Sequence, residues 1–105
     1  MIGEALKGHL DLLLLAILAE GPAHGYAVIE TLRQRSSGTF DLPEGTIYPA
    51  LHRLEKQDLL SSDWSEESGR RKRTYRLTPQ GKLALSKRQK EWQVFSGAVD
   101  ATIGI

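Results

Sequence analysis

The clearest chemical character in this chain belongs to four consecutive cations: Arg70, Arg71, Lys72 and Arg73. Guanidinium and ammonium groups bind the phosphates of nucleic acids, and such contacts position a protein on DNA without reading its sequence. A basic run on its own is more often a solvated loop. We favour DNA as its partner because the run follows a helix whose outer face also suits a polar partner.

That helix is predicted over residues 42–56. Apolar residues recur at helical spacing and place a stripe on one face of it: Ile47, Leu51 and Leu54. The opposite face carries side chains that can reach a polar partner: Thr46, Tyr48, Pro49, His52 and Arg53. An ordinary amphipathic helix with a solvated outer face has the same pattern, so the helix alone does not establish DNA binding.

Two residues shape the front of this helix. Gly45 has no side chain, so a phosphate could approach the backbone closely there. Pro49 has no N–H to donate to the carbonyl one turn back, near Gly45, which predicts a loose and partly open first turn.

Two short strands are predicted after the helix, on either side of a turn at Ser68 and Gly69. Alternation is clearest at Arg73, Tyr75 and Leu77. The basic run then lies where the hairpin tip meets its second strand. A helix followed by a basic hairpin is the arrangement of a winged helix-turn-helix, in which the helix enters the major groove and the hairpin contacts the adjacent backbone.

Length and composition are those of a small soluble domain. The 105 residues suffice for one domain, and a domain of this size gains stability from oligomerisation. Cysteine is absent, which excludes disulfides and favours a reducing compartment. The longest apolar run, residues 12–19, is far shorter than the about 20 residues that span a bilayer. The N-terminus is interrupted by Glu4 and Asp11, unlike a signal peptide. We therefore expect a cytoplasmic protein with no membrane partner.

The net charge of +1 conceals a strong asymmetry. Residues 1–67 hold 5 Lys/Arg and 11 Asp/Glu, a balance of −6. Residues 68–105 hold 9 Lys/Arg and 2 Asp/Glu, a balance of +7. This separation indicates a localised basic surface and not a generally adhesive protein.

Two further helices are expected before residue 42. The first, over residues 6–19, is apolar in nearly every direction, and such a helix is buried on all sides. One small domain can hardly cover both of its faces, so the spare face predicts a partner chain. The second helix is predicted over residues 24–33, with Tyr26 on its apolar face. We interpret Tyr26 and Tyr75 as core aromatics.

The last helix is predicted to begin with Thr78 as its N-cap and Pro79 at its first position. It runs to about Val99, or on to the end of the chain. A stripe of large apolar side chains recurs along it: Leu85, Trp92, Phe95 and Val99. With no further core to meet, this stripe predicts a dimerisation helix that covers the spare face of the first helix. The alternative is that the helix folds back on its own domain.

Together these elements predict a mainly α fold with a small β-hairpin. Residues 1–78 would form a winged helix-turn-helix DNA-binding domain. Residues 79–105 would form a C-terminal dimerisation helix, and the two would make one compact unit.

Catalysis and metal binding have little support. The histidines, His9, His24 and His52, share no ligand-like spacing, so no metal site is expected. The serines have neither a nucleophile elbow nor an assembled base, so no catalytic residue and no cofactor are expected. Two alternatives to a regulator stay open: a winged-helix module that binds a protein instead of DNA, and an architectural DNA binder without an effector.

Over residues 6–85 the chain resembles the PadR (phenolic acid decarboxylase regulator) family of bacterial winged-helix repressors. The most specific shared segment is Gly-Thr-Ile-Tyr-Pro-Ala-Leu, residues 45–51. The other segments occur in the family's order: Leu6-Lys7-Gly8 with Asp11 and residues 14–18, Gly21-Pro22 with His24-Gly25-Tyr26, and Gly69-Arg70 with residues 75–79 and Gly81.

The resemblance implies a homodimer that represses transcription from a two-fold symmetric operator and that a small effector often releases. The family pattern places four residues of the helix in the major groove: Gly45, Thr46, Tyr48 and Pro49. It places three arginines in the wing: Arg70, Arg71 and Arg73. We add Arg53 and Lys72 to the expected DNA contacts. Two positions depart from the pattern, because Arg71 replaces a common proline and Thr74 stands where an aromatic residue is frequent.

Multidrug-sensing members of the family sandwich flat ligands against an aromatic residue of the last helix. By this resemblance, an apolar, planar effector would lie between the two Trp92 side chains of a symmetric dimer. Leu14, Leu18 and Phe95 are expected to line the same site. The alternative is that the two Trp92 rings stack and simply fill the dimer interface.

Overall fold

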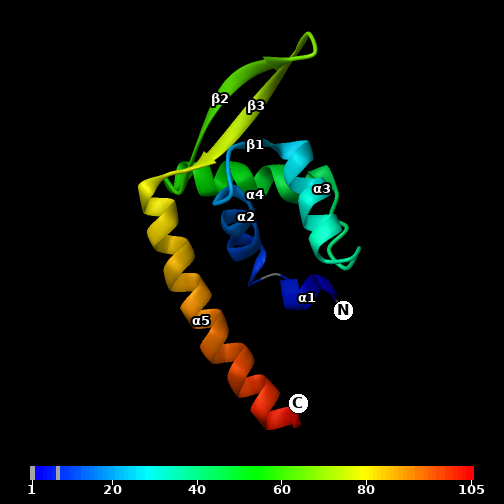
Figure 1. The fold of residues 1–105 in the computed structure, drawn as a ribbon, viewed down its shortest axis with the longest axis vertical. Helices are drawn as coiled ribbons and strands as arrows, with labels where there is room; N and C mark the ends of the chain where they lie inside the picture. The colour runs from blue at the N-terminus through cyan, green and yellow to red at the C-terminus, as the bar shows by residue number, and fades with distance from the viewer. Residues whose placement is uncertain (1, 7) are drawn as a thin grey trace.

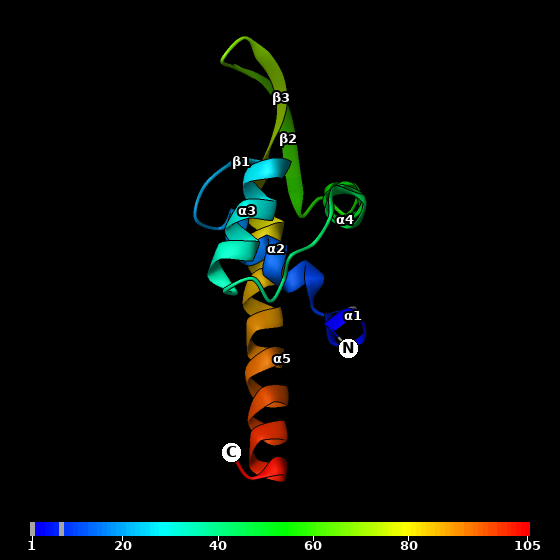
Figure 2. The same cartoon turned by 90° about the vertical axis from the view of Figure 1, so that its right-hand side faces the viewer.

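The computed structural model describes residues 2–6 and 8–105. Its elements follow in the order α1 (Ile2–Leu6), α2 (Leu10–Leu18), β1 (Ala23–His24), α3 (Gly25–Arg35), α4 (Glu44–Lys56), β2 (Leu60–Glu67), β3 (Arg70–Leu77) and α5 (Pro79–Ile103). The hairpin of β2 and β3 extends from one end of the helical body, and α5 leads away from it towards the other end (Figure 1). Seen from the side, α5 is a single straight helix that continues well beyond α2 (Figure 2).

The core lies between α2, α3, α4 and the base of the hairpin. The predicted stripe of α4 is confirmed, because Ile47, Leu51 and Leu54 are fully buried. Ala50 joins them on α4, and the remaining core residues come from five other elements: Leu14, Leu15, Ile17, Leu18, Val28, Ile29, Leu32, Leu60, Tyr75 and Leu85. Because burying each large apolar side chain contributes about 1.5–3 kcal/mol, this cluster fixes α4 firmly and leaves its other face outward.

The first predicted helix is two helices in the structure. α1 ends at Leu6 and α2 begins at Leu10, so the expectation of one helix over residues 6–19 is wrong; Lys7 lies outside the described residues. Gly8, a poor helix former, stands at the break, and the His9 N–H donates to the Leu6 carbonyl at 2.8 Å. The chain also covers more of α2 than expected, because its remaining apolar residues are half-buried against the core: Leu10, Leu12, Leu13 and Ala16.

The sheet has a third strand that the sequence pattern did not reveal. β1 pairs antiparallel with β3, Ala23 opposite Tyr75 and His24 opposite Thr74, so the strand order is β1-β3-β2. Consequently α3 begins at Gly25 and not at His24. The His24 Nδ1 atom caps α3 by accepting a hydrogen bond from the Ala27 N–H at 3.2 Å.

The two tyrosines interpreted as core residues have opposite environments. Tyr75 is 1% exposed, so this prediction is confirmed. Tyr26 is 57% exposed, and the prediction is wrong. The buried face of α3 is formed by Val28, Ile29 and Leu32, a stripe that places Tyr26 on another side of the helix.

α3 and α4 form the helix-turn-helix, with α4 in the recognition position. Pro49 lies inside α4, but the first turn is closed and not loose as predicted, because the N–H groups of Thr46 and Ile47 donate to the Pro43 carbonyl at 3.0 and 3.2 Å. Pro43 precedes the helix in an extended conformation. The helix therefore presents a rigid front end.

The hairpin after α4 has the predicted turn. Ser68 and Gly69 have φ values of 53° and 75°, the left-handed pair of a type I′ turn that matches the twist of a two-stranded ribbon. Leu60 pairs with Leu77 at the base of the hairpin. At the tip Glu67 pairs with Arg70, so the basic run begins directly after the turn.

α5 begins as predicted and runs almost to the end of the chain, the longer of the two predicted extents. The Thr78 hydroxyl accepts a hydrogen bond from the Gly81 N–H at 3.0 Å and donates to the Asp58 carbonyl at 2.6 Å. The helix continues to Ile103, past Val99. Leu85 is buried in the chain's own core, so this residue of the predicted dimer stripe is already covered, whereas Trp92 and Phe95 are exposed.

The predicted fold class, mainly α with a small hairpin in a winged helix-turn-helix and a long C-terminal helix, is confirmed, with β1 as an addition. Among the described helices, none combines the length and the apolar character needed to cross a membrane.

Candidate nucleic-acid interface

Near its front, the outer face of α4 presents small side chains to solvent. Gly45, Thr46 and Pro49 are all exposed near the front of the helix, as the sequence predicts. Their exposure follows from the burial of Ile47, Ala50 and Leu51 on the opposite side. The small side chains at these three positions let this part of the helix approach base edges in a major groove closely.

Arg53, on the same helix, is held by another part of the chain. Its guanidinium donates to Asp11 of α2, and Arg88 of α5 lies 3.7 Å from the other oxygen of that carboxylate. Half of the Arg53 side chain stays exposed. The pair ties α4 to α2 and partly compensates the positive charge of Arg53.

A cleft of about 350 Å³ lies between the front of α3, the middle of α4 and the hairpin. None of the ten described residues that line it is acidic, and they combine aromatic with basic side chains. The lining residues are His24, Gly25, Tyr26, Tyr48, His52, Trp64, Arg71, Lys72, Arg73 and Tyr75. Aromatic hydroxyls and guanidinium groups together suit a phosphodiester backbone.

Tyr26 and Trp64 are members of this cleft that sequence reasoning missed. Both are more than half exposed. A helical stripe through Tyr26 and Ile29 competes with the buried stripe of Val28, Ile29 and Leu32, so spacing alone did not identify Tyr26 as a cleft residue. No pattern in the sequence identifies Trp64 as a cleft residue either, because its position depends on the strand register that places it opposite Arg73.

On the cleft side of the hairpin, two arginines lie over the Trp64 ring. The Arg71 and Arg73 Cζ atoms are 4.8 and 5.4 Å from the ring centroid, within the range of cation–π attraction. Arg70 and Arg71 are exposed and Lys72 is half-buried. Arg73 is also held by Glu55 of α4, at 3.6 Å.

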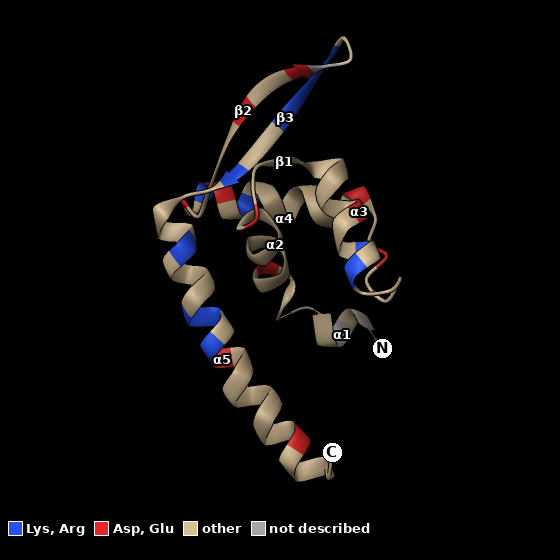
Figure 3. Cartoon of the chain, in the orientation of Figure 1, with Lys and Arg blue, Asp and Glu red and all other residues tan. Residues whose placement is uncertain are grey.

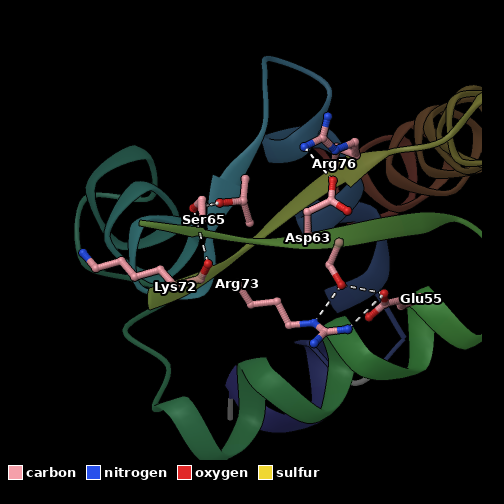
Figure 4. A network of polar contacts seen from close by, with 8 residues as sticks. Glu55, Asp63, Ser65, Lys72, Arg73 and Arg76 are labelled. Carbon is pink, nitrogen blue, oxygen red and sulfur yellow. Dashed lines mark hydrogen bonds and ion pairs between the residues drawn. The ribbon is translucent and has the colours of Figure 1, made fainter. Parts of the chain in front are cut away.

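Charge on the described chain is divided as the sequence predicts. Basic residues gather on β3 and along the first half of α5, while β2 carries acidic ones (Figure 3). On the face of the hairpin away from α4, Asp63 pairs with Arg76 at 3.1 Å and Ser65 bonds to Thr74 at 2.8 Å (Figure 4). These contacts stiffen the hairpin without using Arg70 or Arg71.

A second, apolar cavity of about 400 Å³ lies beside Trp92 of α5, against α1, α2 and the loop before α4. Its lining residues are Ala5, Leu6, His9, Leu12, Leu13, Thr39, Phe40 and Trp92. The rings of His9 and Trp92 meet edge to face, with 4.8 Å between centroids. Phe95 lines the adjoining hollow together with His9 and Trp92.

The expected effector residues Leu14 and Leu18 do not line this cavity. Both belong to the core and are at most 2% exposed. They lie on the side of α2 that faces the core cluster, and Leu12 and Leu13 take their place beside Trp92.

Comparison with known proteins gives a concordant result. A family model described as "Transcriptional regulator PadR-like family" matches residues 14–87. The structure is similar to that of a PadR family transcriptional regulator from Eggerthella lenta, with a TM-score of 0.86 and 32% identity over 99% of this chain and 89% of that one. A transcriptional regulator from Clostridium thermocellum has a TM-score of 0.86 at 28% identity, over 93% and 96% of the two chains.

A curated relative is the transcriptional regulator Rv3488 of Mycobacterium tuberculosis, 38% identical over 68 residues. That match covers 65% of this chain and 61% of the relative, so the relative has sequence beyond the shared part.

Proposed function

Because the chain belongs to the PadR-like family of transcriptional regulators, we propose that it controls transcription as a homodimer bound to an inverted-repeat operator. Repression is the mode we favour, since a dimer seated on a promoter blocks access to it. A small planar effector would release it. Each part of this proposal has support in a different region of the fold.

DNA binding is supported most strongly by the cleft between α4 and the hairpin, whose described lining residues are aromatic and basic with no acid among them. In the arrangement we propose, α4 enters the major groove with Gly45, Thr46 and Pro49 towards the bases. Arg70, Arg71 and Lys72 contact the flanking backbone. The cleft between them receives one phosphodiester strand, with Tyr26 and Tyr48 as hydroxyl donors.

Dimerisation is supported by the far half of α5. This part of the helix extends beyond the body and exposes a set of large apolar side chains: Trp92, Val94, Phe95, Val99 and Ile103. Exposed apolar surface of this extent on a small domain usually marks an interface. A two-fold axis near α5 would place two α4 helices on one side of a duplex, as an inverted repeat requires.

Effector binding is supported by the apolar cavity beside Trp92. It lies against α2 and α5, where a ligand would change the angle at which the proposed dimer presents its α4 helices. Such a ligand alters DNA affinity only if it binds one dimer arrangement better than the other.

Selection of bound genomic fragments, followed by salt titrations, tests the proposed function. We expect the recovered fragments to share an inverted repeat with half-site centres roughly 10 bp apart or a multiple of that. Affinity for them should fall steeply with salt because phosphate contacts release counterions. A protein-binding module would enrich no fragments and show no such salt dependence.

A fluorescence titration tests the effector. The chain has two tryptophans, so Trp64→Phe leaves Trp92 as the single reporter. Planar aromatic cations and phenolic acids that bind should quench it saturably and weaken operator binding. An inducer that still acts on Trp92→Ala would place the effector site elsewhere.

A further inference from the structure

Glu55, in the last turn of α4, joins the recognition helix to both strands of the hairpin. The Ser62 hydroxyl of β2 donates to Glu55 Oε2 at 2.6 Å. The Arg73 Nε–H of β3 donates to the Ser62 hydroxyl oxygen at 2.7 Å, and Arg73 Nη2 lies 3.6 Å from Glu55 Oε2. Figure 4 shows Arg73 directed towards α4 and Glu55.

Arg73 and Ser62 stabilise the negative charge of Glu55, which its position on the helix disfavours. A carboxylate in the last turn of a helix lies near the negative end of the helix dipole, which disfavours its charge. The guanidinium of Arg73 and the hydroxyl of Ser62 compensate for this unfavourable location. About a quarter of the Glu55 side chain is exposed, so the contacts are screened less than those of a surface pair.

The hairpin in turn needs a support. A two-stranded ribbon is marginally stable alone, and β2 and β3 extend well away from the helical body (Figure 1). β1 supports only the base, since its two residues pair with Tyr75 and Thr74. The contact of Arg73 with Ser62 and Glu55 adds a second support, from α4, on the other side of the hairpin base.

Arg73 and Arg71 therefore differ, although they lie on the same side of β3 and both contact Trp64. Arg71 is exposed and makes no ion pair with a described carboxylate, whereas Arg73 is half-buried and occupied by Glu55 and Ser62. A phosphate contact stabilises a guanidinium less when that group is already paired with a carboxylate, because the existing pair must be broken or shared.

We propose that Glu55 is a positioning residue for DNA recognition: it braces the wing against α4 through Ser62 and Arg73 and so withholds Arg73 from the phosphate backbone. The inference rests on the proposed DNA-binding function. Wing geometry, and with it the discrimination between operator and random DNA, then depends on a residue that itself touches no DNA.

The test compares Glu55→Gln and Arg73→Gln with the matched controls Glu66→Gln and Arg71→Gln. Glu66 also lies in this region, opposite Arg71, so its substitution removes the same charge without affecting the brace. For each full-length variant, affinity for operator and for a scrambled duplex is measured from 50 to 200 mM salt.

We expect Arg71→Gln to flatten the log-affinity against log-salt slope by about 0.9, which amounts to about threefold over this salt range. Arg73→Gln should leave the slope unchanged and lower the operator-to-scrambled ratio. Glu55→Gln should steepen the slope by a similar amount, because it frees Arg73, and should also lower that ratio. Glu66→Gln should leave the ratio intact.

A slope for Arg73→Gln that falls as far as that of Arg71→Gln overturns the proposal, as does an unchanged operator-to-scrambled ratio in Glu55→Gln. Thermal unfolding without DNA separates this failure from that of the proposed function. In that measurement, the loss of unfolding free energy in the Glu55→Gln/Arg73→Gln double variant should differ from the sum of the two single losses. If the wild-type protein binds no duplex but the two effects on stability are non-additive, the proposed DNA-binding function is wrong and the contact between Glu55 and Arg73 still holds. If the two effects are additive, the proposed contact is wrong.

Discussion

The ring of Tyr48 in α4 lies against the backbone of Gly25 at the start of α3. A β-carbon on Gly25 would come within 2.4 Å of Tyr48 Cε1 and 2.8 Å of the hydroxyl oxygen. Glycine therefore lets the two helices of the helix-turn-helix approach closely and leaves Tyr48 half-buried at the cleft. Burial raises the pKa of the Tyr48 hydroxyl, and Glu44 raises it further, so the group is a hydrogen-bond donor at neutral pH.

Gly25→Ala should destabilise the fold and displace the Tyr48 ring. The added methyl overlaps the ring, and overpacking of this kind costs about 1–3 kcal/mol. In a Tyr48→Ala background the same substitution should cost close to nothing. Gly45→Ala is the matched control, since a β-carbon there has no described neighbour within 4 Å, and it should be neutral or stabilising. Denaturant unfolding measures all four variants, and equal costs of Gly25→Ala in both backgrounds would contradict this packing.

Arg70→Ala should weaken binding to operator and to unrelated DNA by the same factor. Arg70 is exposed beside the hairpin turn, where phosphates are the expected partner and carry no sequence information. Its loss should flatten the salt slope by about 0.9. Arg76→Ala is the control, because Arg76 lies near the base of the hairpin and pairs with Asp63 at 3.1 Å. A slope that changes equally in both variants would remove the wing tip from the interface.

Alkaline pH should destabilise the fold through Tyr75. Burial raises the pKa of the Tyr75 hydroxyl, Arg73 lowers it and Glu55 raises it, with a net increase above the ordinary value of about 10. As pH rises past that value, the unfolded chain loses the proton first, so stability is fully present below about pH 10 and declines above it. Tyr75→Phe should reduce this decline in urea unfolding curves, and the exposed Tyr26→Phe should not. A decline of equal steepness in Tyr75→Phe would exclude Tyr75 as its source.

Phe95→Glu should convert the proposed dimer to a monomer. Phe95 lies with Trp92 and Val99 on the exposed apolar side of α5, and a charge there would have to be desolvated in an interface. Gln93→Glu adds the same charge at an exposed position of the same helix and should leave the dimer intact. Sedimentation measures both masses. A dimer that survives Phe95→Glu at low micromolar concentration would place the interface elsewhere.

Sequence reasoning succeeded where periodicity carried the information. The stripe of Ile47, Leu51 and Leu54 oriented α4 correctly, and Thr78 and Pro79 marked the start of α5 because capping is local chemistry. β1 was missed because a strand of two residues is too short to show an alternation of apolar and polar side chains.

Contacts between distant residues could not be predicted in the same way. Arg53 and Arg73 both look available for DNA in the sequence. Their partners Asp11 and Glu55 lie on other elements and are brought near only by the fold. Tyr26 was misplaced because a stripe through Val28 and one through Tyr26 are both helical in spacing.

The central claim is that α4 reads DNA sequence while the wing holds the backbone. The ratio of affinities for a selected operator and its scrambled form, measured at one salt concentration for wild type and Thr46→Ala, tests it most directly. The ratio should be about 10³ or more for wild type. It should fall roughly fivefold in Thr46→Ala, the equivalent of about 1 kcal/mol for a lost base contact, while affinity for the scrambled duplex stays the same. An unchanged ratio in Thr46→Ala, or no preference for operator in wild type, would contradict the assignment of α4 as the reading helix.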